Sequence, residues 1–96
     1  MEVCVIIPSP LRSITNGDRK VILSFRYEGT SVESLVTSLS EKYSGIREKI
    51  LDENAKLHPY INIFLNGEDI RYLDGLNTVA KDGDEVSIVP AVAGGY

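Results

Sequence analysis

The helix that decides the fold is expected within residues 30–43, which read TSVESLVTSLSEKY. Thr30 and Glu33 have the spacing of a capping box, in which each side chain bonds the other residue's backbone amide, so the helix should begin there. Gly45 should follow its end as a left-handed cap, and residues 46–51 predict a short second helix. The apolar positions recur at helical spacing and predict one buried stripe: Val32, Leu35, Val36, Leu39 and Tyr43.

Strand patterns flank this helix on both sides. Residues 2–7 are rich in Val and Ile, and residues 20–27 alternate in polarity, so together they predict a β-hairpin. Residues 60–65 also alternate, and an Asn-Gly pair after them predicts a tight turn into a short return strand. A last strand is expected over residues 85–90. This order is typical of an α+β β-grasp fold, a mixed sheet packed on one main helix, with the first and last strands parallel at its centre.

Length and charge restrict the classes of function. Ninety-six residues allow one core, so a single domain is expected over residues 1–90, followed by residues 91–96 as a flexible reactive tail. The net charge of −4 argues against a nucleic-acid partner and against a polybasic membrane anchor. No apolar run approaches the ~18 residues of a membrane span, and the first residues lack the basic region of a signal peptide. With only one Cys, these features predict a cytoplasmic protein.

Residues suited to catalysis or metal binding are scarce. The chain has one His and one Cys, and neither the C-x-x-C nor the H-x-x-H spacing of a metal site. Cys4 lies inside an apolar strand pattern, so we expect a small core residue rather than a reactive thiol. His58 precedes a proline in a polar connection and is expected in a solvated loop. No catalytic or metal site is therefore expected in the chain itself.

The last six residues read AVAGGY. A backbone without side chains at Gly94 and Gly95 can pass through a narrow channel and reach the active site of another protein. The alternative is an ordinary frayed terminus.

Residues 82–95, which read DGDEVSIVPAVAGG, combine a turn, a strand, a proline and a Gly-Gly pair. In this segment, and over nearly the whole chain, the sequence resembles the MoaD/ThiS family of ubiquitin-like sulfur carriers. It is most similar to the carriers of cysteine biosynthesis, on residues 43–46, 57–58, 62–63, 66 and 89–95.

The resemblance implies a carrier that is not an enzyme and binds no cofactor of its own. An E1-like adenylating partner would use ATP to activate the Gly95 carboxylate, and sulfur would displace AMP to leave a thiocarboxylate. Val92, Ala93 and Gly94 would form the arm that delivers it. In the cysteine branch, a pyridoxal-phosphate cysteine-synthase-like enzyme takes the sulfur, and a zinc metallopeptidase releases the amino acid.

The sequence departs from the family pattern at Tyr96, which follows the Gly-Gly pair. Gly95 is then held in an amide bond and has no free carboxylate, so we expect Tyr96 to be a pro-residue that a metallopeptidase removes. Three alternatives stay open. The chain could be the small, MoaD-type subunit of molybdopterin synthase, a ubiquitin-like protein modifier joined through Gly95 to lysines, or a binding domain with a passive tail.

A partner interface is expected on the sheet face away from the helix. If Val86 and Ile88 point toward the helix, alternation places Val89 on the outer face, and the same logic places Tyr60 and Phe64 there. Ile7 is added by the resemblance alone. Which face of the first strand is outer stays open, because both are apolar. An exposed apolar cluster is typical of a protein interface, although covering loops would also explain it.

Overall fold

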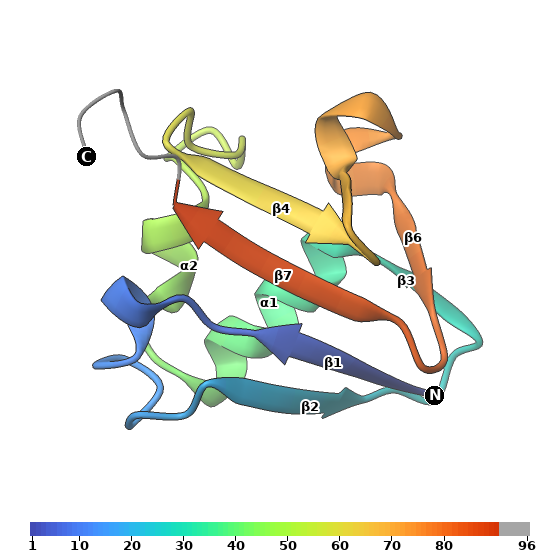
Figure 1. Cartoon of the computed structure of the whole chain (residues 1–96), viewed down its shortest axis with the longest axis horizontal. Coiled ribbons are helices and arrows are strands. Elements are labelled where there is room, and N and C mark those ends of the chain that lie inside the picture. The colour runs from blue at the N-terminus through green and yellow to red at the C-terminus, as the bar shows by residue number, and fades with distance from the viewer. Residues whose placement is uncertain (91–96) are drawn as a thin grey trace.

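A computed structural model describes residues 1–90, so the expected tail, residues 91–96, lies outside the described residues. The chain forms a five-stranded sheet, a separate pair of short strands and two α-helices, joined by loops with short 3-10 turns (Figure 1). In chain order the elements are β1 (Glu2–Ile6), η1 (Ser9–Leu11), β2 (Lys20–Ser24), β3 (Gly29–Ser31), α1 (Val32–Lys42), α2 (Ile46–Ile50), β4 (Ile61–Leu65), β5 (Glu68–Asp69), η2 (Ile70–Tyr72), η3 (Gly75–Asn77), β6 (Val79–Lys81) and β7 (Glu85–Pro90).

The main sheet has the strand order β2-β1-β7-β4-β5, and both α-helices lie behind it in Figure 1. β1 runs antiparallel to β2 and parallel to β7, while β4 runs antiparallel to both β7 and β5. The sheet is therefore mixed, with the first and last strands side by side at its centre. The expected β-grasp fold is confirmed.

The core lies between the sheet and α1. Val3 and Val5 of β1 and Val86 and Ile88 of β7 are at most 3% exposed, because alternation turns them all toward the helix. The predicted stripe of α1 is buried against them, and so are the predicted apolar positions of the second helix, Ile46, Ile50 and Leu51. Burial of this apolar surface is the main favourable contribution to folding.

The start of α1 differs from the capping-box expectation by one residue. Ser31 is the N-cap, and its hydroxyl accepts a hydrogen bond from the Ser34 amide (3.1 Å). Thr30 instead pairs with Ala80 in the small sheet of β3 and β6. The end also differs, because α1 stops at Lys42, and Gly45 (φ 92°) precedes α2 rather than capping α1. The predicted left-handed conformation of Gly45 is present, but Gly45 caps the start of α2 instead of the end of α1.

Ser31→Ala should lower the free energy of unfolding by about 1 kcal/mol, because one N-terminal amide of α1 loses its side-chain partner. Chemical denaturation would measure the change. Thr30→Ala is the matched control, since the Thr30 side chain makes no hydrogen bond to the start of α1. If Thr30→Ala lowers the free energy of unfolding more than Ser31→Ala does, Thr30 and not Ser31 caps the helix.

The β3–β6 pair was not expected from the sequence. Each strand has three residues, and Gly29 of β3 approaches β6 closely: a Cβ at Gly29 would lie 2.9 Å from Val79 Cγ1. In the sequence, Gly29 looks like the end of a strand because glycine is rare within strands. In the structure, its missing side chain lets β3 and β6 pack closely. The small sheet leads the chain from β2 into α1 and from η3 toward β7.

Candidate functional site

The face of the main sheet turned away from the helices carries several apolar side chains among the polar ones usual at a solvent-facing surface. The strand register aligns Ile6 with Ser87, and Ser87 with Phe64, in one row across β1, β7 and β4. Val89 of β7 and Ile22 of β2 lie on the same side of the sheet, 39% and 47% exposed. We call Ile6, Ile22, Phe64 and Val89 the apolar face. Exposed apolar side chains grouped on one sheet face are typical of a protein interface.

The structure places the four expected interface residues differently. Val89 is exposed and Phe64 is half-buried, and both lie on the apolar face. Tyr60, 54% exposed, precedes β4. Ile7 is completely buried, so its expected place on an exposed face is wrong. It shares the inward parity of Val3 and Val5, and its neighbour Ile6 takes the outer position.

Cys4 corrects a second expectation. It is only partly buried, and it pairs with Ile22 on one side and Glu85 on the other, so it belongs to the outer side of β1 instead of the core. The inward positions of this strand are taken by Val3 and Val5. Any experiment that follows sulfur on this chain must therefore treat Cys4 as a reachable thiol.

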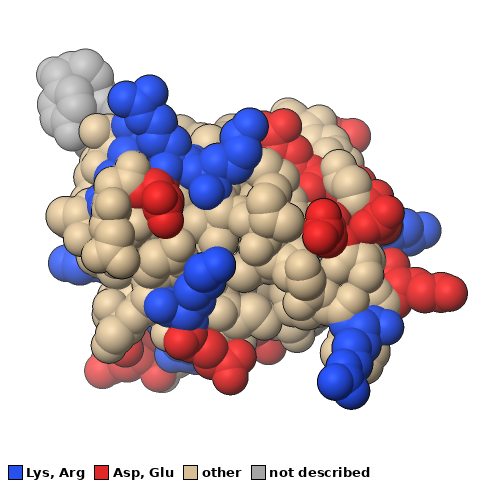
Figure 2. Space-filling model, turned by 90° about the horizontal axis from the view of Figure 1, so that it is seen from below, with Lys and Arg blue, Asp and Glu red and all other residues tan. Residues whose placement is uncertain are grey.

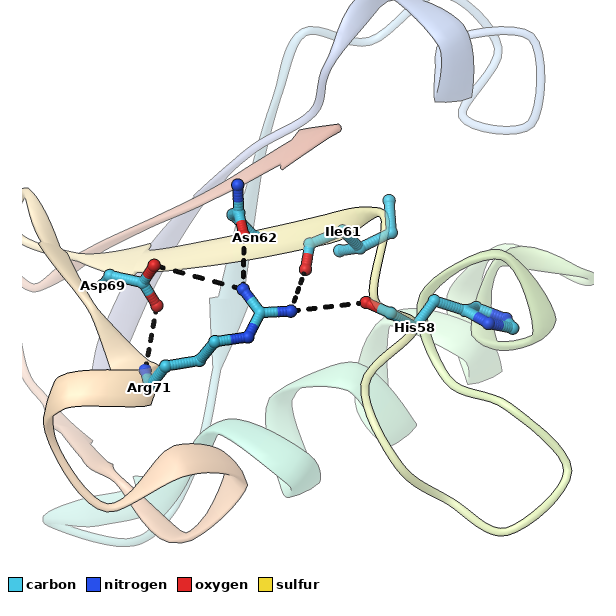
Figure 3. Close-up of polar contacts among 5 residues, drawn as sticks. All are labelled: His58, Ile61, Asn62, Asp69 and Arg71. Carbon is cyan, nitrogen blue, oxygen red and sulfur yellow. Dashed lines mark hydrogen bonds and ion pairs between the residues drawn. The ribbon is translucent and has the colours of Figure 1, made fainter. Parts of the chain in front are cut away.

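Arg71 joins the η2 turn to the beginning of β4 (Figure 3). Its guanidinium donates to Asn62 Oδ1, to Ile61 O (2.8 Å) and to His58 O (3.4 Å), and it lies 4.0 Å from Asp69 Oδ2. Since β5 pairs only with the last residues of β4, Arg71 supplies donors along the part of this edge that β5 leaves open.

This arrangement supports the end of β7. Ile61 pairs with Pro90 and Asn62 with Val89, so two of the residues that Arg71 bonds lie beside the last described residues of the chain. Sequence reasoning did not single out Arg71, because a lone arginine in a loop follows no periodic pattern. Only its contacts in the folded chain identify it.

His58 and Tyr60 form a small ordered unit next to this edge. Their rings stack with centroids 4.7 Å apart, and His58 Nε2 lies 3.0 Å from the Glu48 carbonyl oxygen. His58 is partly buried, so the expectation of a freely solvated loop histidine holds only in part. The stack fixes the direction of the exposed Tyr60 ring, which suits a contact residue.

Among residues 1–90, two ionisable groups have shifted pKa values, and neither points to catalysis. Burial raises the pKa of Tyr43, and its hydroxyl donates to Asp18 Oδ2 (3.0 Å), which raises it further. The backbone amide of Lys56 lowers the pKa of Asp52 by donating to its carboxylate, and the Asn54 amide adds to this effect. Both are loop-ordering contacts rather than a pair of groups matched for proton transfer.

Within residues 1–90, no group of three His, Cys, Asp or Glu side chains is arranged to hold a metal ion. None of the helices in the described part of the chain is long and apolar enough to cross a membrane. The predicted Gly95 centre, its arm of Val92, Ala93 and Gly94, and Tyr96 lie outside the described residues.

Comparison with known proteins shows the family to which this chain belongs. The family model described as the ThiS family matches residues 5–95, so the chain belongs to the ThiS family. The sulfur carrier protein CysO of Mycobacterium tuberculosis (strain ATCC 25618 / H37Rv) is 43% identical over 97 residues, which cover 99% of this chain and 100% of the relative.

Two solved structures extend the comparison. CysO in the Amycolatopsis orientalis BexX/CysO complex superposes with a TM-score of 0.86 and is 38% identical, with 97% of this chain and 99% of that chain covered. The small archaeal modifier protein 1 from Methanosarcina acetivorans superposes with a TM-score of 0.78 and is 37% identical, with 98% and 96% covered.

Proposed function

We propose that this chain is a sulfur carrier of the CysO type that holds sulfur as a thiocarboxylate on Gly95. The observation that carries the proposal is the full-length similarity to CysO, together with a family match that extends to residue 95. The described residues fit a carrier, because they provide a paired sheet and an exposed apolar side chain beside the end of β7. The reacting group is then the chain's own carboxylate, and partner proteins supply the catalysis.

The chemistry explains why such a carrier needs a partner with ATP. A carboxylate is a poor electrophile. Attack of a Gly95 carboxylate oxygen on the α-phosphorus of ATP releases pyrophosphate and forms an acyl-adenylate. Hydrosulfide then attacks the acyl carbon, AMP leaves with the bonding electrons, and loss of the sulfur-bound proton leaves a thiocarboxylate. ATP is bound by the E1-like adenylating partner, and the chain contributes only its carboxyl group.

The apolar face is the proposed docking surface for that partner. Phe64 and Val89 lie on strands adjacent to one another, and Val89 is followed at once by the last residue of β7. A partner bound over Val89 is therefore positioned to receive the residues that follow Pro90. The complex of a similar CysO with BexX supports the idea that a carrier of this fold acts while bound to another protein.

Two further partners complete the proposal. A zinc metallopeptidase would hydrolyse the Gly95–Tyr96 bond and so free the carboxylate. A pyridoxal-phosphate cysteine-synthase-like enzyme would accept the sulfur, for cysteine or a related thio-metabolite. Both rest on the resemblance to the cysteine-biosynthesis carriers.

Other relatives favour second candidates. Similarity to a small archaeal modifier protein favours a modifier that is joined through Gly95 to lysines of target proteins. The molybdopterin synthase sulfur carrier subunit of M. tuberculosis is 36% identical over 67 residues, which favours a MoaD-type subunit. Higher-mass conjugates in cells would support the first, and a stable complex with a large catalytic subunit would support the second.

Intact mass spectrometry tests the carrier proposal directly. The chain ending at Gly95 is purified after coexpression with its adenylating partner. Its mass should rise by the difference between one sulfur and one oxygen atom, and reducing agent should leave this product intact. A persulfide on Cys4 would instead add a whole sulfur and be lost on reduction. Cys4→Ser should still be loaded, and a chain that lacks Gly95 should not. Loading that depends on Cys4 would overturn the proposal.

A further inference from the structure

The two ends of the central strand pair carry opposite charge. Where β1 and β7 begin, four carboxylates lie beside the Met1 ammonium and Lys81: Glu2, Asp82, Asp84 and Glu85. The Glu2 amide donates to Asp82 Oδ1 (2.7 Å), and the Cys4 amide donates to the Asp84 carbonyl oxygen. Cys4 also pairs with Glu85, so backbone contacts hold the four acidic residues together.

Where the same strands end, cations gather on both sides. On the β1 side, Arg12 Nε donates to Ile7 O (3.1 Å), the Ile7 amide donates to Arg19 O (2.8 Å), and Lys20 pairs with Ile6. On the β4 side, Arg71 is bound to the residues that pair with Val89 and Pro90. We call Arg12, Arg19, Lys20 and Arg71 the cationic collar.

The collar keeps a positive excess in a chain of net charge −4. Two acids lie beside it: Asp18, which accepts from the Tyr43 hydroxyl, and Asp69, near Arg71. Counted over these six side chains alone, four cations against two acids leave two positive charges in excess. In Figure 2, basic atoms gather mainly in the upper left, toward the end at which β7 finishes, and acidic atoms prevail in the upper right, whereas the lower part of the view has acidic atoms at the left and basic atoms at the right.

The arrangement of these cations fits a broad acidic surface better than a single small anion. They flank β7 from two sides and come from η2 and from the β1–β2 connection, so they do not converge on one point. Arg12 and Arg71 are already bonded to backbone carbonyls. Arg19 and Lys20 are exposed, and no side-chain hydrogen bond or ion pair to either is found within residues 1–90.

We infer that the cationic collar is an electrostatic docking ring for acidic groups at the mouth of the partner site that receives the residues after Pro90. This inference rests on the proposed function and names the charge of the partner's surface. The apolar face alone supplies contact area, but it does not orient the carrier as it approaches the partner. Attraction at the collar and repulsion at the acidic end would together turn the carrier with the end of β7 toward the partner before contact.

The test compares two charge-reversed chains of equal net charge. Arg19→Glu with Lys20→Glu changes the collar, and Arg26→Glu with Lys81→Glu makes the same change at exposed positions away from it. Binding of each chain to the E1-like adenylating enzyme of the same organism is followed by stopped-flow and equilibrium titration. Uncleaved chains are used, so that no chemistry is needed for the readout.

The collar variant should bind about tenfold more weakly at low salt, through slower association, and the difference should shrink at high salt. The control should stay within about twofold of the unaltered chain, since its added charges lie at the acidic end, which faces away from the partner in the proposed orientation. Equal weakening in both chains, or none in either, overturns the inference. If the reversed collar chain melts early, Arg19→Gln with Lys20→Gln replaces it, with about threefold weaker binding expected.

The same enzyme separates this inference from the proposed function. If the chain ending at Gly95 supports no ATP–pyrophosphate exchange but the uncleaved chain binds with collar dependence, the carrier chemistry fails and the docking ring stands. If exchange occurs and is insensitive to the collar charges at low salt, the docking ring fails and the carrier chemistry stands.

Discussion

A chain that ends at Gly95 should support ATP–pyrophosphate exchange with the adenylating enzyme, whereas the chain that continues into Tyr96 should not. The Gly95–Tyr96 amide offers no carboxylate oxygen to attack the α-phosphorus of ATP, so the reacting group is missing rather than weakened. Exchange with the uncleaved chain should therefore stay at the background of the enzyme alone. Exchange of labelled pyrophosphate into ATP measures the difference directly.

Tyr96→Ala is the matched control, because it removes the aromatic ring but keeps the amide bond. It should be as inactive as the uncleaved chain, and binding of both to the enzyme should be retained. Equal exchange by the uncleaved and the shortened chains would show that Tyr96 is no block. Activity in the Tyr96→Ala chain would show that the ring, and not the missing carboxylate, is responsible.

Val89→Asp should weaken binding to the adenylating partner by about 2 kcal/mol, or roughly 30-fold, because it places a charge at the centre of a proposed apolar contact. The side chain is 39% exposed, so the cost to folding should be small. Phe64→Asp should weaken binding at least as much, with a larger loss of stability, because Phe64 is more buried.

Val79→Asp is the control for Val89→Asp. Val79 is 51% exposed on β6, outside the main sheet, so the same substitution there should leave partner affinity unchanged. Affinity and thermal unfolding are measured on the same samples. Unchanged affinity for Val89→Asp would remove it from the interface, and a large drop in melting temperature would assign it to the core.

Periodic patterns in the sequence were sufficient to predict the main sheet, α1 and its buried face. The strands and the helix each have many residues that follow the same pattern, apolar inward and polar outward, so a single exception changes the prediction little. Val86 and Ile88 face inward as that rule requires, and Val89 faces outward.

The predictions that failed concern residues whose local pattern is ambiguous. Both faces of β1 are apolar, so alternation could not tell Ile6 from Ile7, and only the packed structure shows that Ile7 is buried. Thr30 and Ser31 can both cap a helix, and pairing of Thr30 with Ala80 leaves the cap to Ser31. Arg71 and the collar depend on contacts between distant segments, which no single-chain pattern encodes.

The place of β7 between two neighbours also has a mechanical consequence. A partner that draws the residues after Pro90 into its active site pulls along the axis of β7. The strand is paired with β1 on one side and with β4 on the other, so the load acts in shear on both ladders at once. Hydrogen bonds loaded together resist force better than bonds opened one after another. The body of the protein can thus act as a fixed anchor while its C-terminal segment is under tension.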